Sequence, residues 1–297
     1  MKILSAAKSI GQTMLAGLLG MGIVVFASSV WVALMFANLK TSPAIPWAAP
    51  VMLSVLWLMW RYLGGKGWPQ SNAAERRRLL RANPVSRQAY LWTAIAGVLG
   101  LVALTGYWIV FSQLAPIHAN MLLPEFSRYP RLMVIATILV ASLNAPLMEE
   151  AGFRGYCQQM LERRFRPWAA IAITAIFFMV AHLNHGLVWP KLLVYFLAGV
   201  LLSVIAYVNN SILPCIPVHI LADLTFFTLV WPHDGTRRLV SQGGADTWFW
   251  IHVTQAIVFT PLAILAFRRL ARVAGPARAK TAVQRIHCGD LGLQGAK

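Results

Sequence analysis

Two adjacent glutamates, Glu149 and Glu150, end a run of apolar and small residues, and Arg154 follows four positions after the second. The chain has only nine acidic residues among 297, so a pair of them in an apolar segment stands out. An ionisable residue inside a membrane is costly, and by default it marks a functional site. A buried carboxylate whose proton affinity is tuned by its neighbours can act as a general base that activates a water molecule.

Two later apolar segments each contain a histidine, His182 and His219, and Asp223 follows His219 by one helical turn. Either imidazole could hold the same water or share its proton. His219 with Asp223 could stabilise an oxyanion, or Asp223 could orient the His219 ring. Two histidines and one carboxylate, here His182, His219 and Glu149, would also satisfy a catalytic zinc site with one open position. We expect no cofactor, with zinc as the alternative, and these residues alone leave both designs open.

The composition identifies a polytopic membrane protein. Mean hydropathy is +0.63, 58% of the residues are hydrophobic and only 12% are charged, whereas ordinary globular chains are about 25% charged. The net charge of +17 lies in the connections between apolar segments, where it sets membrane topology. We therefore expect the lipid bilayer as a partner and no nucleic acid. The three cysteines have no paired spacing that would indicate a disulfide framework.

The hydropathy pattern predicts an all-α membrane bundle of about eight transmembrane helices. They are expected at 10–38, 46–63, 89–115, 131–160, 168–188, 190–208, 212–231 and 248–267. With the N-terminus inside, 20 of the 26 Lys and Arg residues fall on the inner side. Because positive loops stay in the cytoplasm, this bias predicts that both termini are cytoplasmic. We divide the chain into 1–130 (three helices and a basic loop), 131–231 (catalytic core) and 232–297 (last helix and basic tail).

The expected helices bring the polar residues to a similar depth. Taking the cluster of arginines at 163–166 as the cytoplasmic edge, a rise of 1.5 Å per residue places Glu149 and Glu150 roughly 20 Å from it. The same rise places His182 roughly 23 Å, His219 roughly 14 Å and Asp223 roughly 20 Å from that edge. Any one of these residues could be structural, and Glu150 with Arg154 could be a simple ion pair. Their convergence in one layer favours an active site.

Three motifs in this region resemble those of the CAAX-protease and bacteriocin-processing family of intramembrane endopeptidases. Glu149-Glu150-Ala-Gly-Phe-Arg154 matches the E-E-x-x-x-R motif, and Phe178-Met-Val-Ala-His182 matches F-x-x-x-H. His219-Ile-Leu-Ala-Asp223 matches H-x-x-x-N, with Asp in place of Asn. The motifs follow the family's order on separate predicted helices.

The resemblance implies an all-helical protease with its active site inside the membrane. By analogy, Glu149 would activate water with the help of His182, while Glu150 and Arg154 would position Glu149. His219 and Asp223 would form the oxyanion side, although an ionised Asp223 would repel the developing negative charge. The sequence has no H-E-x-x-H pattern, which favours the metal-free glutamate type over the metalloprotease type. The nearest spacing is His182 with His185, and a separation of three residues can place both rings on one metal.

We therefore predict an intramembrane endopeptidase that cleaves a membrane-associated peptide or protein, in the cytoplasmic (inner) membrane of a bacterium. One alternative is a proton-coupled transporter, because chains of Glu, His and Asp also relay protons. The polar residues are confined to four consecutive segments, however, whereas transporters usually repeat such features in both halves. The other alternative is a non-enzymatic immunity or scaffold protein that retains the motifs as structure.

Overall fold

The computed structural model describes residues 2–115, 126–183, 186–230 and 237–293, and this part of the chain is helical, with no strand. The α-helices are α1 (Lys2–Thr41), α2 (Ala48–Leu63), α3 (Ala73–Leu80), α4 (Arg87–Leu114), α5 (Arg131–Glu149), α6 (Gln158–Glu162), α7 (Pro167–Ala181), α8 (Trp189–Asn209), α9 (Cys215–Thr225) and α11 (Thr247–Leu293). Two π-helical segments, η3 (Glu150–Cys157) and η5 (Phe226–Val230), continue α5 and α9.

The described residues form an integral, multi-pass membrane bundle. Five helical segments are long and apolar enough to cross a bilayer: 9–41, 87–114, 131–162, 189–209 and 247–275. Three shorter apolar helices, at 48–63, 167–181 and 215–230, coincide with the other predicted segments. The all-helical membrane class is thus confirmed, whereas the count of eight spans, the cytoplasmic orientation and the three-part division remain predictions.

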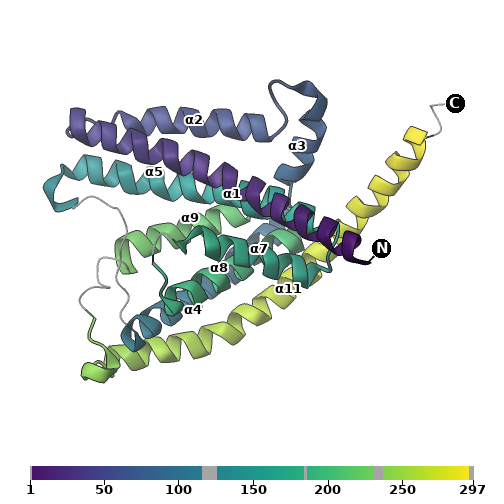
Figure 1. Ribbon diagram of the computed structural model, residues 1–297. Coiled ribbons are helices and arrows are strands. Elements are labelled where there is room, and N and C mark those ends of the chain that lie inside the picture. The colour runs from purple at the N-terminus through teal and green to yellow at the C-terminus, as the bar shows by residue number, and fades with distance from the viewer. Residues whose placement is uncertain (1, 116–125, 184–185, 231–236, 294–297) are drawn as a thin grey trace.

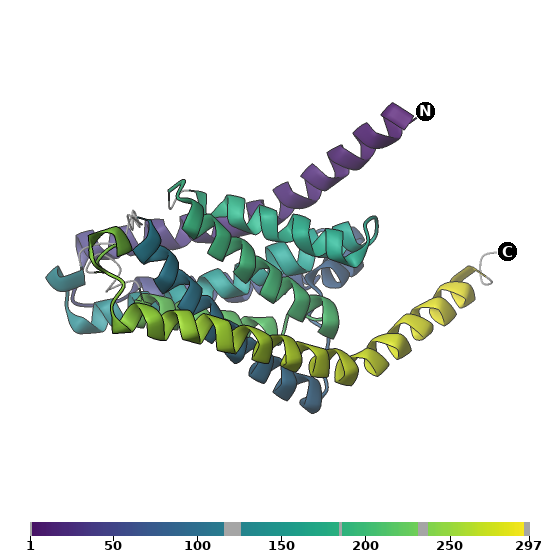
Figure 2. The ribbon, with the colours of Figure 1, turned by 90° about the horizontal axis from the view of Figure 1, so that it is seen from below.

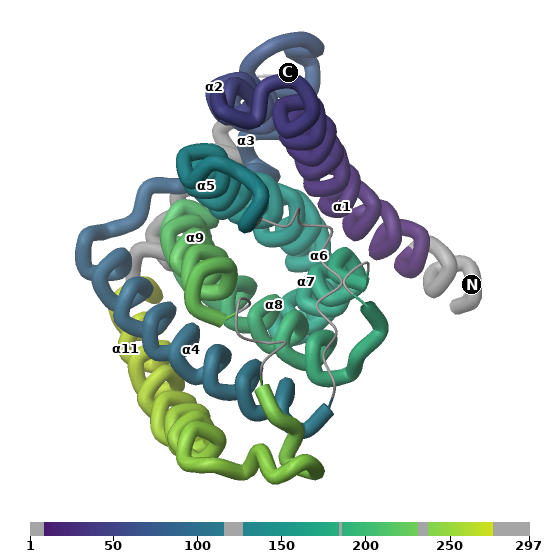
Figure 3. The backbone as a smooth tube through the Cα atoms, turned by 90° about the vertical axis from the view of Figure 1, so that its left-hand side faces the viewer, coloured from purple at the N-terminus to yellow at the C-terminus, as the bar shows by residue number. Residues whose placement is uncertain are grey.

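The helices lie in three layers (Figures 1 and 3). Helices α1 and α2 form one side, and α4 with α11 forms the opposite side. Between them, α5 packs on α9, and α7 packs on α8. The start of α1 and the end of α11 extend from the same end of the bundle (Figure 2). The segments carrying the polar motifs therefore occupy the middle layer, where the cost of exposing charge to lipid is avoided.

The glutamate motif lies where α5 changes into the π-helix η3. Pro146, inside α5, has no backbone N–H and cannot complete the hydrogen-bond ladder of an α-helix. From Glu150 the helix continues with the wider turns of a π-helix, and all eight residues of η3 are buried. A second π-helix, η5, starts three residues after Asp223. Such wide turns are rare and occur frequently at functional sites.

Two glycines let η3 approach α1 closely. A Cβ atom added to Gly152 would lie 2.5 Å from the carbonyl oxygen of Gly20, and one added to Gly20 would lie 2.7 Å from the carbonyl oxygen of Gly152. Small residues of this kind allow two membrane helices to pack backbone against backbone. The position of the glutamate motif is therefore set partly by α1, far away in the sequence.

Helix α7 is shorter than its hydropathy predicts. It ends at Ala181, so His182 is the C-cap and not an interior residue of a helix reaching 188. Gly186 has φ of 104°, a conformation outside the α-helical region that glycine adopts readily. The predicted segment extends to residue 188 because Leu187 and Val188 are apolar, although polar residues follow Ala181 directly.

Candidate active site

The centre of the polar cluster is a buried relay from Arg154 through Glu150 to His219. Nη1 of Arg154 donates a hydrogen bond to Oε1 of Glu150 at 3.0 Å, and the same oxygen lies 2.8 Å from Nδ1 of His219. The side chains of Arg154 and Glu150 are fully buried, and that of His219 is almost so. A carboxylate oxygen can only accept, so Nδ1 of His219 carries the hydrogen in this bond.

The other ring nitrogen of His219 faces two more carboxylates. Its Nε2 atom lies 3.8 Å from Oε2 of Glu149 and 3.7 Å from Oδ1 of Asp223. Both distances exceed a hydrogen bond. Within the described residues, Oε2 of Glu149 is buried and has no hydrogen-bond partner. Two carboxylate groups thus face Nε2 of His219 at distances slightly longer than a direct hydrogen bond.

The cluster contains more acid than base. Three carboxylates, from Glu149, Glu150 and Asp223, surround His219, and Arg154 is paired with one of them. Uncompensated charge is expensive in a low-dielectric interior. Only protons can offset the excess negative charge where counter-ions do not penetrate, so this group of side chains is suited to taking up and releasing protons.

His182 lies at the edge of the cluster. Its Nδ1 atom is 2.8 Å from the carbonyl oxygen of Phe178, four residues earlier. The carbonyl can only accept, so Nδ1 carries the hydrogen, and Nε2 of the neutral ring has a lone pair for another donor. The imidazole stacks on the ring of Tyr195 with centroids 4.2 Å apart. Both contacts hold the half-buried ring in one orientation.

Phe178 joins the two histidines and the arginine. Its ring centroid lies 4.6 Å from that of His182 and 6.1 Å from that of His219. The guanidinium carbon of Arg154 lies 4.3 Å from the centroid of the same ring. A cation over an aromatic face is attracted by the ring's quadrupole, more strongly where water is excluded. The F-x-x-x-H spacing thus supplies both an aromatic platform and the carbonyl that orients His182.

The structure therefore brings Glu149, Glu150, Arg154, His219 and Asp223 into one cluster, with His182 connected to it through Phe178. The family analogy expects Glu150 and Arg154 to position Glu149, and this role stays a prediction. The described hydrogen bonds of Glu150 run to Arg154 and His219. Asp223 was one candidate for orienting the His219 ring, and Glu150 makes that bond.

Sequence reasoning assigned no role to Phe178 or to Tyr195. Phe178 was detectable as the first residue of the F-x-x-x-H pattern, and in the structure it contacts the ring of His182. Tyr195 has no signal in the sequence, because it lies among apolar residues of α8 and meets His182 only through the packing of α7 on α8.

A metal site was tested against the same geometry. Among the described residues, no group of three or more His, Cys, Asp and Glu side chains has an arrangement that could hold a metal ion. The alternative set of His182, His219 and Glu149 is not such a group as these side chains stand, so no step is derived through a metal. His185 lies outside the residues that the structure describes.

Comparison with known proteins finds a family model that matches the segment carrying this site. Residues 131–225 match the family model described as type II CAAX prenyl endopeptidase Rce1-like. The matched segment begins at α5 and ends at the last residue of α9, so it includes all three motifs. No curated protein and no solved structure matched the chain significantly. The match confirms the resemblance to the CAAX-protease and bacteriocin-processing family, and it indicates a membrane protease.

Proposed function

We propose that the chain is an intramembrane endopeptidase in which Glu149 activates a water molecule for attack on a peptide bond. One observation carries this proposal. Oε2 of Glu149 is buried, has no hydrogen-bond partner among the described residues, and lies 3.8 Å from Nε2 of His219. A buried carboxylate oxygen without a partner suits a general base that accepts a proton from water, and Nε2 of His219 faces the same space.

In the proposed reaction, Glu149 takes a proton from water while the water oxygen bonds to the carbonyl carbon of the substrate. His182 accepts a hydrogen bond from this water at its Nε2 atom and fixes its direction. His219, protonated on both nitrogens, donates from Nε2 to the oxygen of the tetrahedral intermediate. Glu150 compensates the charge of the imidazolium. Glu149 then gives its proton to the leaving amine as the carbon–nitrogen bond breaks.

The proposal also includes a role for Asp223 that takes its negative charge into account. An ionised carboxylate beside a developing oxyanion would oppose the reaction. Asp223 lies 3.7 Å from Nε2 of His219. We propose that it either stabilises the positive charge of the imidazolium between turnovers or is itself protonated. The proposed substrate is a membrane-associated peptide or protein, cleaved within the cytoplasmic membrane of a bacterium. The family description names prenyl endopeptidases. A lipid-modified protein is one example of the membrane-associated substrates that we propose.

A matched pair of glutamate substitutions tests the proposal. Purified parent, Glu149→Gln and Glu75→Gln proteins would be reconstituted in lipid vesicles with quenched fluorescent membrane peptides. Glu75 is exposed on α3 and pairs with Arg78 and Arg163, so the same chemical change there controls for handling. We expect Glu149→Gln to lower kcat at least about 100-fold and Glu75→Gln to retain it. Near-normal turnover by folded Glu149→Gln would refute this role of Glu149.

A further inference from the structure

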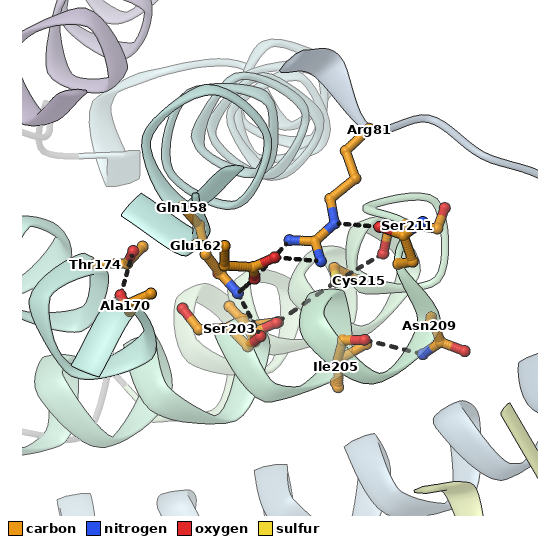
Figure 4. A network of polar contacts seen from close by, with 12 residues as sticks. Arg81, Gln158, Glu162, Ala170, Thr174, Ser203, Ile205, Asn209, Ser211 and Cys215 are labelled. Atoms are coloured by element: carbon orange, nitrogen blue, oxygen red, sulfur yellow. Dashed lines mark hydrogen bonds and ion pairs between the residues drawn. The ribbon is translucent and has the colours of Figure 1, made fainter. Parts of the chain in front are cut away.

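A second buried polar network, away from the histidines, connects the basic loop to the catalytic segment (Figure 4). Arg81 follows α3 and its side chain is fully buried. Its Nη1 and Nη2 atoms donate to the two carboxylate oxygens of Glu162, each at 3.0 Å. Glu162 is the last residue of α6, the continuation of η3. This two-pronged pairing sets both the distance and the orientation between the loop and the end of that segment.

Gln158 extends the network to α8. Its Nε2 atom donates to Oε1 of Glu162 at 2.8 Å and to the carbonyl oxygen of Ser203 at 3.0 Å. Figure 4 shows these side chains between the two helices. One turn earlier, Nη2 of Arg154 donates to the carbonyl oxygen of Gly199 at 3.4 Å. Two side chains four residues apart thus bond to two backbone carbonyls four residues apart.

These two parallel bonds attach the η3–α6 segment to α8 along one helical turn, roughly 6 Å. Arg154 is the residue at which this attachment meets the relay to Glu150 and His219. A lateral shift of η3 on α8 would move both glutamates relative to His219, which stands on α9. The attachment therefore bears directly on the 3.8 Å separation between Glu149 and His219.

Stability alone is a weak reason for such a network. Burying an ion pair costs desolvation energy that its attraction often fails to recover, and well-packed apolar residues are commonly as stable or more so. What this network supplies is a preferred arrangement of the elements that it joins, because both oxygens of Glu162 and the amide nitrogen of Gln158 are bonded, although Oε1 of Gln158 has no partner among the described residues.

We propose that Arg81, Gln158 and Glu162 are positioning residues, which fix η3 on α8 and thereby set the distance between Glu149 and His219. The part of this proposal that concerns catalysis rests on the proposed function, whereas the part that concerns placement does not. Two measurements separate them.

The first measurement is the labelling of Cys157 by a small thiol reagent, quantified by peptide mass spectrometry on folded protein in detergent. Cys157 is buried and directly precedes Gln158. Gln158→Leu keeps the side-chain volume but removes both bonds, so we expect labelling to accelerate about tenfold through local opening. Arg81→Lys retains the positive charge but lacks the two guanidinium nitrogens that pair with Glu162, so it should accelerate labelling less than Gln158→Leu does. Unchanged labelling in both variants would overturn the proposal.

The second measurement is the pH dependence of kcat for a membrane peptide. We expect Gln158→Leu to lower kcat about tenfold, to leave KM nearly unchanged, and to alter the shape of the pH profile as well as its height. Glu75→Gln is the control, because it removes an exposed ion pair between the same loop and Arg163, next to α6. Faster labelling with an unaltered kcat and profile would show a purely structural network. If the parent protein cleaved no peptide, only the proposed function would be refuted, because the labelling measurement would still test whether the network fixes η3 on α8.

Discussion

Oε1 of Glu150 lies 2.8 Å from Nδ1 of His219, although 69 residues separate the two in the sequence. Because of this bond, the second glutamate of the motif contacts a different atom of His219 from the first. Oε1 of Glu150 orients a histidine and is itself held by Arg154, while Oε2 of Glu149 lies 3.8 Å from the other nitrogen of that histidine. The Oε2 atoms of both glutamates are buried without a described partner. Adjacent residues on one helix turn thus point to different tasks, and substitutions should separate them.

Glu150→Gln should damage both activity and stability. The amide oxygen can still accept from His219, but the negative charge that pairs with buried Arg154 is lost. Removing one partner of a buried ion pair costs about 3–5 kcal/mol. Unfolding by a denaturing detergent would show this loss for Glu150→Gln and a much smaller one for Glu149→Gln. Equal stability of the two variants would contradict the assignment.

Arg154→Lys should give a protein intermediate between the parent and Arg154→Met. Lysine retains a charge for Glu150, but it lacks the planar guanidinium that also reaches Gly199 and covers the Phe178 ring. We expect the thermal unfolding midpoint to fall in the order parent, lysine variant, methionine variant. Loss of peptide cleavage should follow the same order. A methionine variant as stable as the parent would show that the pair adds nothing.

Gly152→Ala should destabilise the contact between η3 and α1. The new methyl group would lie 2.5 Å from the carbonyl oxygen of Gly20, so one backbone must move. Overpacking of this kind costs about 1–3 kcal/mol. Gly22→Ala is a matched control on α1, since nothing described lies within 4 Å of its added Cβ. The thermal midpoints of the two variants should differ clearly, and equal midpoints would argue against the close approach.

The exposed Glu75 should make a small contribution to stability that disappears in acid. Partial burial raises the pKa of this carboxyl, but the hydrogen bond and charge of Arg163 and the charge of Arg78 outweigh it and lower the pKa overall. The contribution is therefore present above the ordinary value of 4.5 and is lost as the pH falls through the lower folded value. Exposed pairs are worth at most about 1 kcal/mol.

Thermal unfolding of Glu75→Gln and the parent across this range of pH would measure the contribution. The difference between them should be small at pH 7, vanish at low pH and shrink in high salt, because solvent ions screen exposed charges. A difference that grows on acidification would reverse the sign and contradict the pairing.

Peptide cleavage should persist in strong chelators. In the proposed reaction, water is activated by Glu149 and oriented by His182, and no step needs a Lewis acid. Metal analysis of the purified active protein, alongside activity before and after chelation, would test this expectation. Zinc present in a one-to-one ratio, removed together with activity and restored together with it, would instead require the ligand set of His182, His219 and Glu149 to rearrange.

Much of the fold follows from local sequence. Long apolar stretches with few charges have one low-energy form in lipid, the helix, because every backbone polar group must be satisfied internally. The predicted segments accordingly coincide with the described helices within a few residues at most ends. The predicted end of α7 at residue 188 was wrong, because the helix ends at Ala181 and the backbone at Gly186 is no longer α-helical.

The candidate site divides in the same way. Residue types and spacing alone single out Glu149, Glu150, Arg154, His182, His219 and Asp223. Ionisable groups are rare in apolar segments, and two pairs of them, Glu150 with Arg154 and His219 with Asp223, are spaced i,i+4. Which of them contact one another depends on how α5, α7 and α9 pack, and a helix sequence carries no record of its rotation against a neighbour. The bond from His219 to Glu150, the stacking of Tyr195 on His182 and the attachment of Gln158 to α8 were therefore decided only by the tertiary structure.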